Sequence, residues 1–197
     1  MNTRYVAVAA VPLAAILALT GCSGGSGSMP GMDHGSAPMT TSTTAASASE
    51  SDILFVTTMI PHHEQAIEMS DTLLSKTGVD ERVTALAEQI TAAQQPEIDT
   101  MKGWLSDWGV SMSEGMSGMD HGGMMSESDM QALAAADASD AARLYLEQMI
   151  EHHQGAIDMA QDEIDSGTDS EVVALARSIV DSQAAEISTM KELTASL

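Results

Sequence analysis

The sequence predicts an all-α protein whose main domain is an antiparallel four-helix bundle, built from two copies of one helical hairpin. Three observations support this prediction. An eleven-residue motif occurs twice, ninety positions apart. Apolar residues recur at helical spacing in both copies. Glycines and capping residues stand where a pair of helices would end and begin in each copy.

The first 21 residues have the organisation of a bacterial lipoprotein signal peptide. Arg4 precedes an apolar run from Val6 to Leu19, which is shorter than the ~20 residues that a helix needs to span a bilayer. The run ends in Leu-Thr-Gly-Cys22, which resembles a lipobox and implies cleavage before Cys22 and lipidation of its sulfur. We therefore expect a secreted protein, lipid-anchored to the outer face of the bacterial cell membrane. A plain signal peptide with an incidental cysteine is the alternative.

Two segments have too few large aliphatic residues to form a core. Residues 22–50 are mainly Gly, Ser, Thr, Ala and Pro and predict a disordered tether that contains Met and His. Residues 109–138 form a Met- and His-rich linker, of which the part from Gly109 to about Asp129 has the same composition as the tether. The net charge of −22 argues against binding to nucleic acid, because such a surface repels anions and concentrates cations.

Repeat one, residues 51–108, predicts helices at Ser51–Thr77 and Asp80–Trp108. Gly78 ends the first helix and Asp80 can cap the second. At ~100° per residue, six apolar residues of the first helix fall within about 60° of one line: Phe55, Val56, Met59, Ala66, Leu73 and Leu74.

Repeat two, residues 139–197, predicts helices at Ser139–Ser166 and Ser170–Ser196. Gly167 ends the first of these helices and Ser170 can cap the second. The motif Met-Ile-Pro-His-His-Glu-Gln-Ala-Ile-Glu-Met of residues 59–69 recurs as Met-Ile-Glu-His-His-Gln-Gly-Ala-Ile-Asp-Met at 149–159. The second helices match at a spacing of eighty-nine, so that Gln94, Glu97 and Met101 correspond to Gln183, Glu186 and Met190. The two hairpins together make the four-helix domain of residues 51–197.

The four histidines of the His-His steps flank the apolar stripes of their helices, and we predict that they form a metal site in the core. Buried imidazoles need a partner for each ring nitrogen, and neutral imidazole is a common metal ligand. Glu97 and Glu186 also fall on apolar stripes, where a carboxylate requires a cation or a histidine N–H. The alternative is that these groups bond only to one another and fix the helix register. The predicted core ligands are Met59, His62, His63, Met69, Met149, His152, His153, Met159, Glu97, Glu186, Met101 and Met190.

The other two histidines lie in Met-x-x-Met-x-His segments of the tether and the linker. A disordered segment has no core for methionine to fill, and thioether sulfur is a soft ligand that selects Cu(I) over Cu(II) and also suits silver. We predict a second set of ligands there: Met29, Met32, His34, Met116, Met119 and His121. Sacrificial methionine that absorbs oxidant is the alternative.

The repeated motif resembles that of the DUF305 family (domain of unknown function) of secreted proteins, marked by Met-Ile-x-His-His-x-x-Ala-Ile-x-Met. The resemblance covers both repeats and implies a ferritin-like fold; some periplasmic members bind copper. Carried over by position, it points to the Met and His residues of both motifs as ligands. Gly155, which stands where the first copy has Gln65, and the Met-rich linker are departures from the family pattern.

These observations together predict a copper-binding lipoprotein that captures copper and buffers or delivers it, with a copper-transfer protein as a further partner. We expect no enzymatic activity, because no nucleophile–base pair, phosphate loop or nucleotide fingerprint is present. A ferritin-like metal oxidase is one alternative. It is disfavoured because neither Glu97 nor Glu186 has a histidine three residues later, as di-iron bundles require. A structural cell-envelope bundle without metal is the other alternative.

Overall fold

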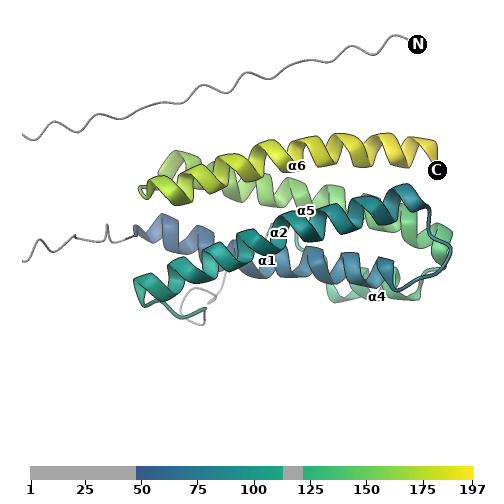
Figure 1. Cartoon of the computed structure of the whole chain (residues 1–197), viewed down its shortest axis with the longest axis horizontal. Coiled ribbons are helices and arrows are strands. Elements are labelled where there is room, and N and C mark those ends of the chain that lie inside the picture. The colour runs from purple at the N-terminus through teal and green to yellow at the C-terminus, as the bar shows by residue number, and fades with distance from the viewer. Residues whose placement is uncertain (1–47, 113–121) are drawn as a thin grey trace, which may run out of the picture. The chain divides into compact units, whose positions relative to one another are not determined.

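The computed structural model describes residues 48–112 and 122–197, and the elements of this part of the chain are helical (Figure 1). They are α1 (Glu50–Leu74), α2 (Glu81–Trp108), α4 (Glu127–Ala135), α5 (Ala138–Ser166) and α6 (Ser170–Ser196). All five belong to one compact unit. The predicted all-α bundle of two helical hairpins is therefore confirmed.

The four long helices are arranged as two hairpins that meet through their first helices. α1 packs mainly on α2, and α5 packs mainly on α6. α1 also packs along α5, whereas α2 and α6 contact each other at few positions. The two His-His steps lie on α1 and α5, so the contact between the hairpins brings the two copies of the motif together.

Side-chain caps fix where the helices begin. Ser49 and Asp52 form a reciprocal capping box at the start of α1. The α2 cap is Asp80, as the sequence predicts. The α6 cap is Asp169, whose carboxylate accepts from the backbone N–H groups of Glu171 and Val172, so the predicted cap Ser170 is the first residue of the helix. α1 ends at Leu74, three residues before the predicted end, and the chain turns through Gly78 with a φ of +85°.

Part of the predicted linker is folded onto the bundle. α4 packs against α1 and α5, and Leu133 on α4 is fully buried. Met125 is only 8% exposed and belongs to the same hydrophobic cluster as Ala66, Met69 and Leu133. Met125 therefore fills a core, and the expectation that linker methionines lack such a role does not hold for it. The reason is that α4 and the segment before it pack on α1 and α5, which composition alone does not reveal.

A lysine holds the end of α4. Lys76 Nζ donates to the carbonyl oxygens of Ala134 at 2.8 Å and Ala136 at 2.9 Å. A cation at a helix C-terminus satisfies carbonyls that lack a helical partner and interacts favourably with the helix dipole.

The Lys76→Met variant should therefore lower the free energy of unfolding by about 0.5–1 kcal/mol, because the methionine keeps the apolar stem and removes only the charge and the donors. Urea unfolding measures this change. Amide hydrogen exchange should show the loss of protection confined to the last turn of α4, and a uniform loss across the bundle would contradict this assignment.

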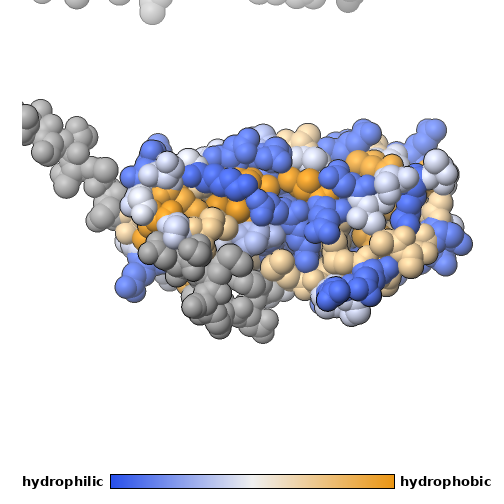
Figure 2. All heavy atoms as spheres, turned by 90° about the horizontal axis from the view of Figure 1, so that it is seen from below, coloured by the Kyte–Doolittle hydropathy of each residue, from blue (hydrophilic) through white to orange (hydrophobic). Residues whose placement is uncertain are grey.

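The surface agrees with the acidic composition. Figure 2 shows hydrophilic side chains over much of one face of the bundle, with hydrophobic residues between them. None of the helices in the described residues is both long and apolar enough to cross a membrane.

Candidate functional site

Four imidazoles lie together where α1 and α5 pack. His62 and His63 come from α1, His152 and His153 come from α5, and all four are 0% exposed. The rings of His62 and His152 touch across the interface, with their centroids 3.7 Å apart and their planes at 40°. We call these four residues the histidine layer. Its burial agrees with the helical-wheel argument that placed the histidines beside the apolar stripes.

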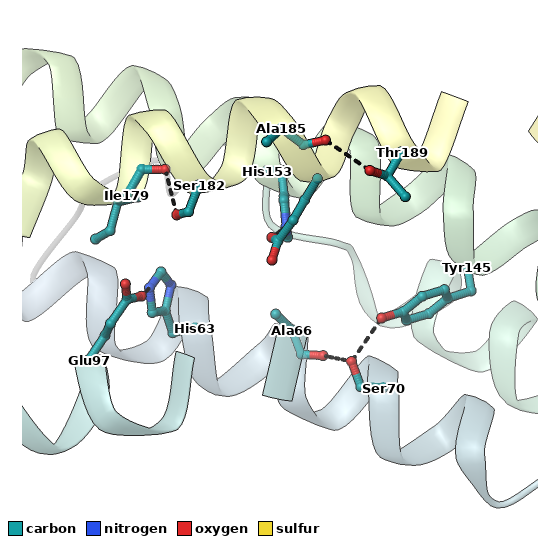
Figure 3. Close-up of polar contacts among 11 residues, drawn as sticks. His63, Ala66, Ser70, Glu97, Tyr145, His153, Ile179, Ser182, Ala185 and Thr189 are labelled. Atoms are coloured by element: carbon teal, nitrogen blue, oxygen red, sulfur yellow. Dashed lines mark hydrogen bonds and ion pairs between the residues drawn. The ribbon is translucent and has the colours of Figure 1, made fainter. Parts of the chain in front are cut away.

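Each hairpin adds one carboxylate to the histidine layer. His63 Nε2 lies 2.8 Å from Glu97 Oε2 on α2, and His153 Nε2 lies 2.7 Å from Glu186 Oε2 on α6. Figure 3 shows the first pair on one hairpin and His153 on the other. Because an ionised carboxylate can only accept, each pair is an Nε2–H donating to oxygen. This arrangement fixes the tautomer and leaves Nδ1 with a lone pair.

The remaining ring nitrogens of the two pairs fit a metal ligand. Nδ1 of His63 and Nδ1 of His153 are buried and have no hydrogen-bond partner among the described residues. An imidazole that donates to a carboxylate through one nitrogen and offers the other is the usual form of a metal-binding histidine. The two repeats each supply one such group.

One member of the histidine layer, His152, is held in its neutral form. Burial lowers the pKa of His152 well below its usual value, and the positive charge that His62, His153 and His63 would carry lowers it further. A neutral imidazole is the form that binds metal. Among the described residues, no three His, Cys, Asp or Glu side chains converge as a ready metal-binding group. An ion at this layer would therefore require thioether ligands or a rotated imidazole.

The predicted methionine ligands divide between two hydrophobic clusters. Met59 and Met101 belong to a cluster with Phe55, Ala156 and Ala160. Three other predicted ligands, Met69, Met149 and Met190, belong to the cluster that contains Ala66 and Tyr145. Along both α1 and α5 the histidines stand between the two clusters. The histidine layer is therefore a polar layer with apolar side chains, including Met59 and Met149, on either side of it.

Met159 lies apart from the other helical methionines. It is partly buried and lines a surface cavity of about 410 Å³. Three carboxylates share this cavity with it, along one face of α5: Glu151, Asp158 and Asp162. The remaining lining residues are Gly122, Gly123, Gln154 and Gly155.

The predicted lipidation site and the second set of predicted ligands lie outside the described residues. These are Cys22, Met29, Met32, His34, Met116, Met119 and His121.

Two buried glutamines were not among the predicted site residues. Gln94 and Gln183 are each 2% exposed, and the Oε1 of each has no hydrogen-bond partner among the described residues. They stand three residues before Glu97 and Glu186, which is nearly one helical turn. Their signal in the sequence was an uncharged polar residue on an apolar stripe, repeated at the spacing of the second helices.

An acidic cluster at one end of the bundle was also missed. Asp52 is 0% exposed and accepts hydrogen bonds from Thr168 N at 3.0 Å and Asp169 N at 3.1 Å, in the turn between α5 and α6. Glu163, 1% exposed, accepts from the Ser51 hydroxyl at 3.1 Å. Asp52 of repeat one corresponds to Ala142 of repeat two, and Glu163 of repeat two corresponds to Leu73 of repeat one; Ala142 and Leu73 belong to one apolar cluster. The carboxylates therefore occur at only one of two equivalent ends.

The titration of this acidic cluster is strongly perturbed. Burial would raise the pKa of Asp52, but hydrogen bonds from Ser49 and Asp169 hold it below its usual range. Burial, with the adjacent Asp52 carboxylate, raises the pKa of Glu163 to about 7.

A second polar contact is also present at one end only. The hydroxyls of Ser70 and Tyr145 lie 2.9 Å apart (Figure 3). Ser70 corresponds to Ala160 in repeat two, and Tyr145 corresponds to Phe55 in repeat one; Ala160 and Phe55 have no hydroxyl and share an apolar cluster. The hydroxyl pair is therefore not part of the repeated site.

Comparison with known proteins agrees with this architecture. A DUF305 protein fragment from Deinococcus radiodurans is 31% identical with a TM-score of 0.69, over 76% of this chain and 99% of that chain. A DUF305 protein from Streptomyces coelicolor is 35% identical with a TM-score of 0.69, over 74% and 93%. No curated protein matches the chain.

The protein CopM in its Cu(II)-bound form is 34% identical, with a TM-score of 0.63 over 74% of this chain and 96% of that chain. Its Cu(I)-bound form and its silver-bound form obtained by soaking are each 32% identical to this chain. The model of the DUF305 family, described as a domain of unknown function, matches residues 24–194. With its two His-His hairpins and its similarity to these structures, the chain belongs to the DUF305 family.

Proposed function

We propose that this protein is an extracytoplasmic copper-binding lipoprotein that captures copper and buffers or delivers it. One observation carries the proposal. Two imidazoles of the histidine layer, His63 and His153, donate through Nε2 to carboxylates and keep a buried Nδ1 that has no other partner in the described residues. The similarity to CopM in its copper-bound and silver-bound forms supports copper as the cargo.

The surrounding ligands favour Cu(I). Met59 and Met149 lie on either side of the histidine layer, and a site that mixes imidazole and thioether is soft. The Met-x-x-Met-x-His segments of the sequence would capture the ion, and the histidine layer would hold it. The protein would be anchored through Cys22 and would transfer copper to a protein partner rather than catalyse a reaction.

The test removes the histidine layer from a chain that has no other histidine ligand. In a background with Met29, Met32, His34, Met116, Met119 and His121 replaced by serine, all four histidines of the layer are changed to alanine. We expect Cu(I) affinity to fall by about 100-fold or more, because the imidazoles are the main donors of the site. Competition with a colorimetric Cu(I) chelator measures the affinity, and circular dichroism checks that the bundle remains helical.

Two further variants make the result specific. His63→Gln with His153→Gln keeps an N–H donor for each carboxylate but offers no ring nitrogen, so it should also lose Cu(I). Ser70→Ala with Tyr145→Phe removes a buried polar pair by introducing at each position the residue type found at its counterpart in the repeat, and this variant should bind Cu(I) as the parent does. Unchanged affinity in both histidine variants would mean that the histidine layer is a structural feature of an envelope bundle without metal.

A further inference from the structure

A short non-helical segment crosses from α5 to α1 before α4 begins. We call this segment, Gly122–Met125, the strap. Gln65 on α1 holds it with both ends of its amide: Nε2 donates to Met125 O at 2.9 Å, and Oε1 accepts from Met125 N at 2.7 Å. Both backbone hydrogen-bonding groups of Met125 are thereby satisfied by one side chain.

The other end of the strap rests directly on the backbone of α5. A Cβ on Gly155 would collide with Gly122 O and lie 2.7 Å from Gly123 Cα. Gly123 has a φ of +83°, which favours glycine, and a Cβ there would lie 3.1 Å from Glu151 O. Only glycine at position 155 lets the strap approach this closely.

Gln65 and Gly155 occupy the same position in the two copies of the motif. One linker crosses the bundle, so the two equivalent positions meet different parts of it. Gln65 binds the strap, and Gly155 makes room for it. This explains in structural terms why the motif differs at this position between the repeats.

The strap crosses on the side of the touching His62–His152 pair. At ~100° per residue, His62 lies about 60° from Gln65 on α1, and His152 lies about 60° from Gly155 on α5. The strap contacts α5 at Glu151 and Gly155, and the two histidines of α5 lie between these residues on the same helical turn. His63 and His153 face the other way, towards their carboxylates on α2 and α6.

We propose that the strap is the cover of the His62–His152 pair, and that Gln65 and Gly155 are the positioning residues that seat it. The rings are fully buried, so an ion from solvent reaches them only when something moves. The strap is the short non-helical element beside them, and it can lift without breaking a helix. This inference rests on the proposed function, since it assigns the route by which metal enters and leaves the histidine layer.

The test displaces the strap with one methyl group. In the serine background described above, Gly155→Ala forces the strap away from α5. Gly103→Ala is the matched control, because the same change in α2 meets no atom within 4 Å. We expect transfer of Cu(I) to an excess of chelator to become about tenfold faster in Gly155→Ala only, with little change in the equilibrium affinity, because lifting a cover speeds entry and exit alike.

A second variant releases the strap without a collision. Gln65→Leu removes both hydrogen bonds to Met125, so the Met125 amide should lose its protection from hydrogen exchange, and Cu(I) transfer should again accelerate. A readout without metal accompanies both variants: modification of His62 and His152 by diethyl pyrocarbonate, followed by mass spectrometry, should be faster in each variant than in Gly103→Ala.

The outcomes separate the cover from the proposed function. Faster modification in the two strap variants, with no metal bound by any form, would support the cover and overturn the copper proposal. Loss of Met125 protection with unchanged modification and unchanged Cu(I) transfer would overturn the cover. In that case copper enters and leaves the histidine layer past Glu97 and Glu186, whose side chains are 18% and 21% exposed.

Discussion

Replacing Asp52 with alanine is expected to lower the free energy of unfolding by about 3–5 kcal/mol, because removal of this fully buried carboxylate leaves several hydrogen-bond donors without an acceptor. Asp52 accepts from Ser49 N at 2.6 Å and from the Ser49 hydroxyl at 2.7 Å, which closes the capping box of α1. It also accepts from two backbone N–H groups and the hydroxyl of Thr168 in the α5–α6 turn. One side chain thus caps a helix and joins it to a turn more than a hundred residues away.

A matched variant separates these two roles. Asp129 occupies the same capping-box position in α4, with Ser126 as its partner. Asp129→Ala should lower the free energy of unfolding by only about 0.5–2 kcal/mol, as expected for a lost cap. Urea unfolding of both variants gives the comparison. Equal losses would show that the bonds from Asp52 to Thr168 and Asp169 contribute nothing beyond the cap.

The second large effect is a dependence of stability on pH. The pKa of Glu163 rises from 4.5 to about 7 on folding, so between these values the folded protein binds more protons than the unfolded chain. Its contribution to stability is complete below about pH 4.5 and is lost as the pH rises through about 7. We expect a loss on the order of 2 kcal/mol at this site.

Glu163→Gln tests this assignment, since the amide can donate to Asp52 at every pH. The variant should be more stable than the parent at pH 8 and close to it at pH 4.5. Thermal melting across this range measures the difference. A control at an exposed carboxylate of the same helix, Glu147→Gln, should leave the pH profile of the parent unchanged. An identical profile in Glu163→Gln would mean that Glu163 does not titrate in this range.

The sequence predicted the parts of the fold that repeat. The four long helices, their pairing into hairpins and the burial of both His-His steps follow from periodicity and from the recurrence of one motif. The stripe positions of Glu97 and Glu186 also indicated a need for a histidine N–H or a cation, and the structure places each against a histidine. The internal repeat supported these predictions, because each pattern occurs in both halves of the sequence.

The features that occur once were not predictable in the same way. Asp52 and Glu163 meet across a separation of more than a hundred residues, and the repeat gives no hint of them because the corresponding positions hold Ala142 and Leu73. The burial of Met125 depends on where a glycine-rich segment crosses from α5 to α1, and neither hydrophobic periodicity nor composition encodes that path. The role of Gly155 needed the position of the strap, since a glycine within a helix predicts only a loss of helix propensity.

The strap makes the order of the two hairpins along the chain matter, although the hairpins have similar structures. In a circularly permuted chain with the hairpins exchanged, a transplanted linker would run along the symmetry-related path from the second hairpin to the first. Its glycine end would then lie against Gln65, where it needs a residue without a side chain. Its Met125 end would lie against Gly155, where it needs the side-chain amide of a glutamine. Such a permutant would lose two hydrogen bonds and gain a steric conflict, although every helix could pair as before. Exchange of the residues at positions 65 and 155 is the compensating change. The two halves of the chain are therefore similar in shape but not interchangeable in order.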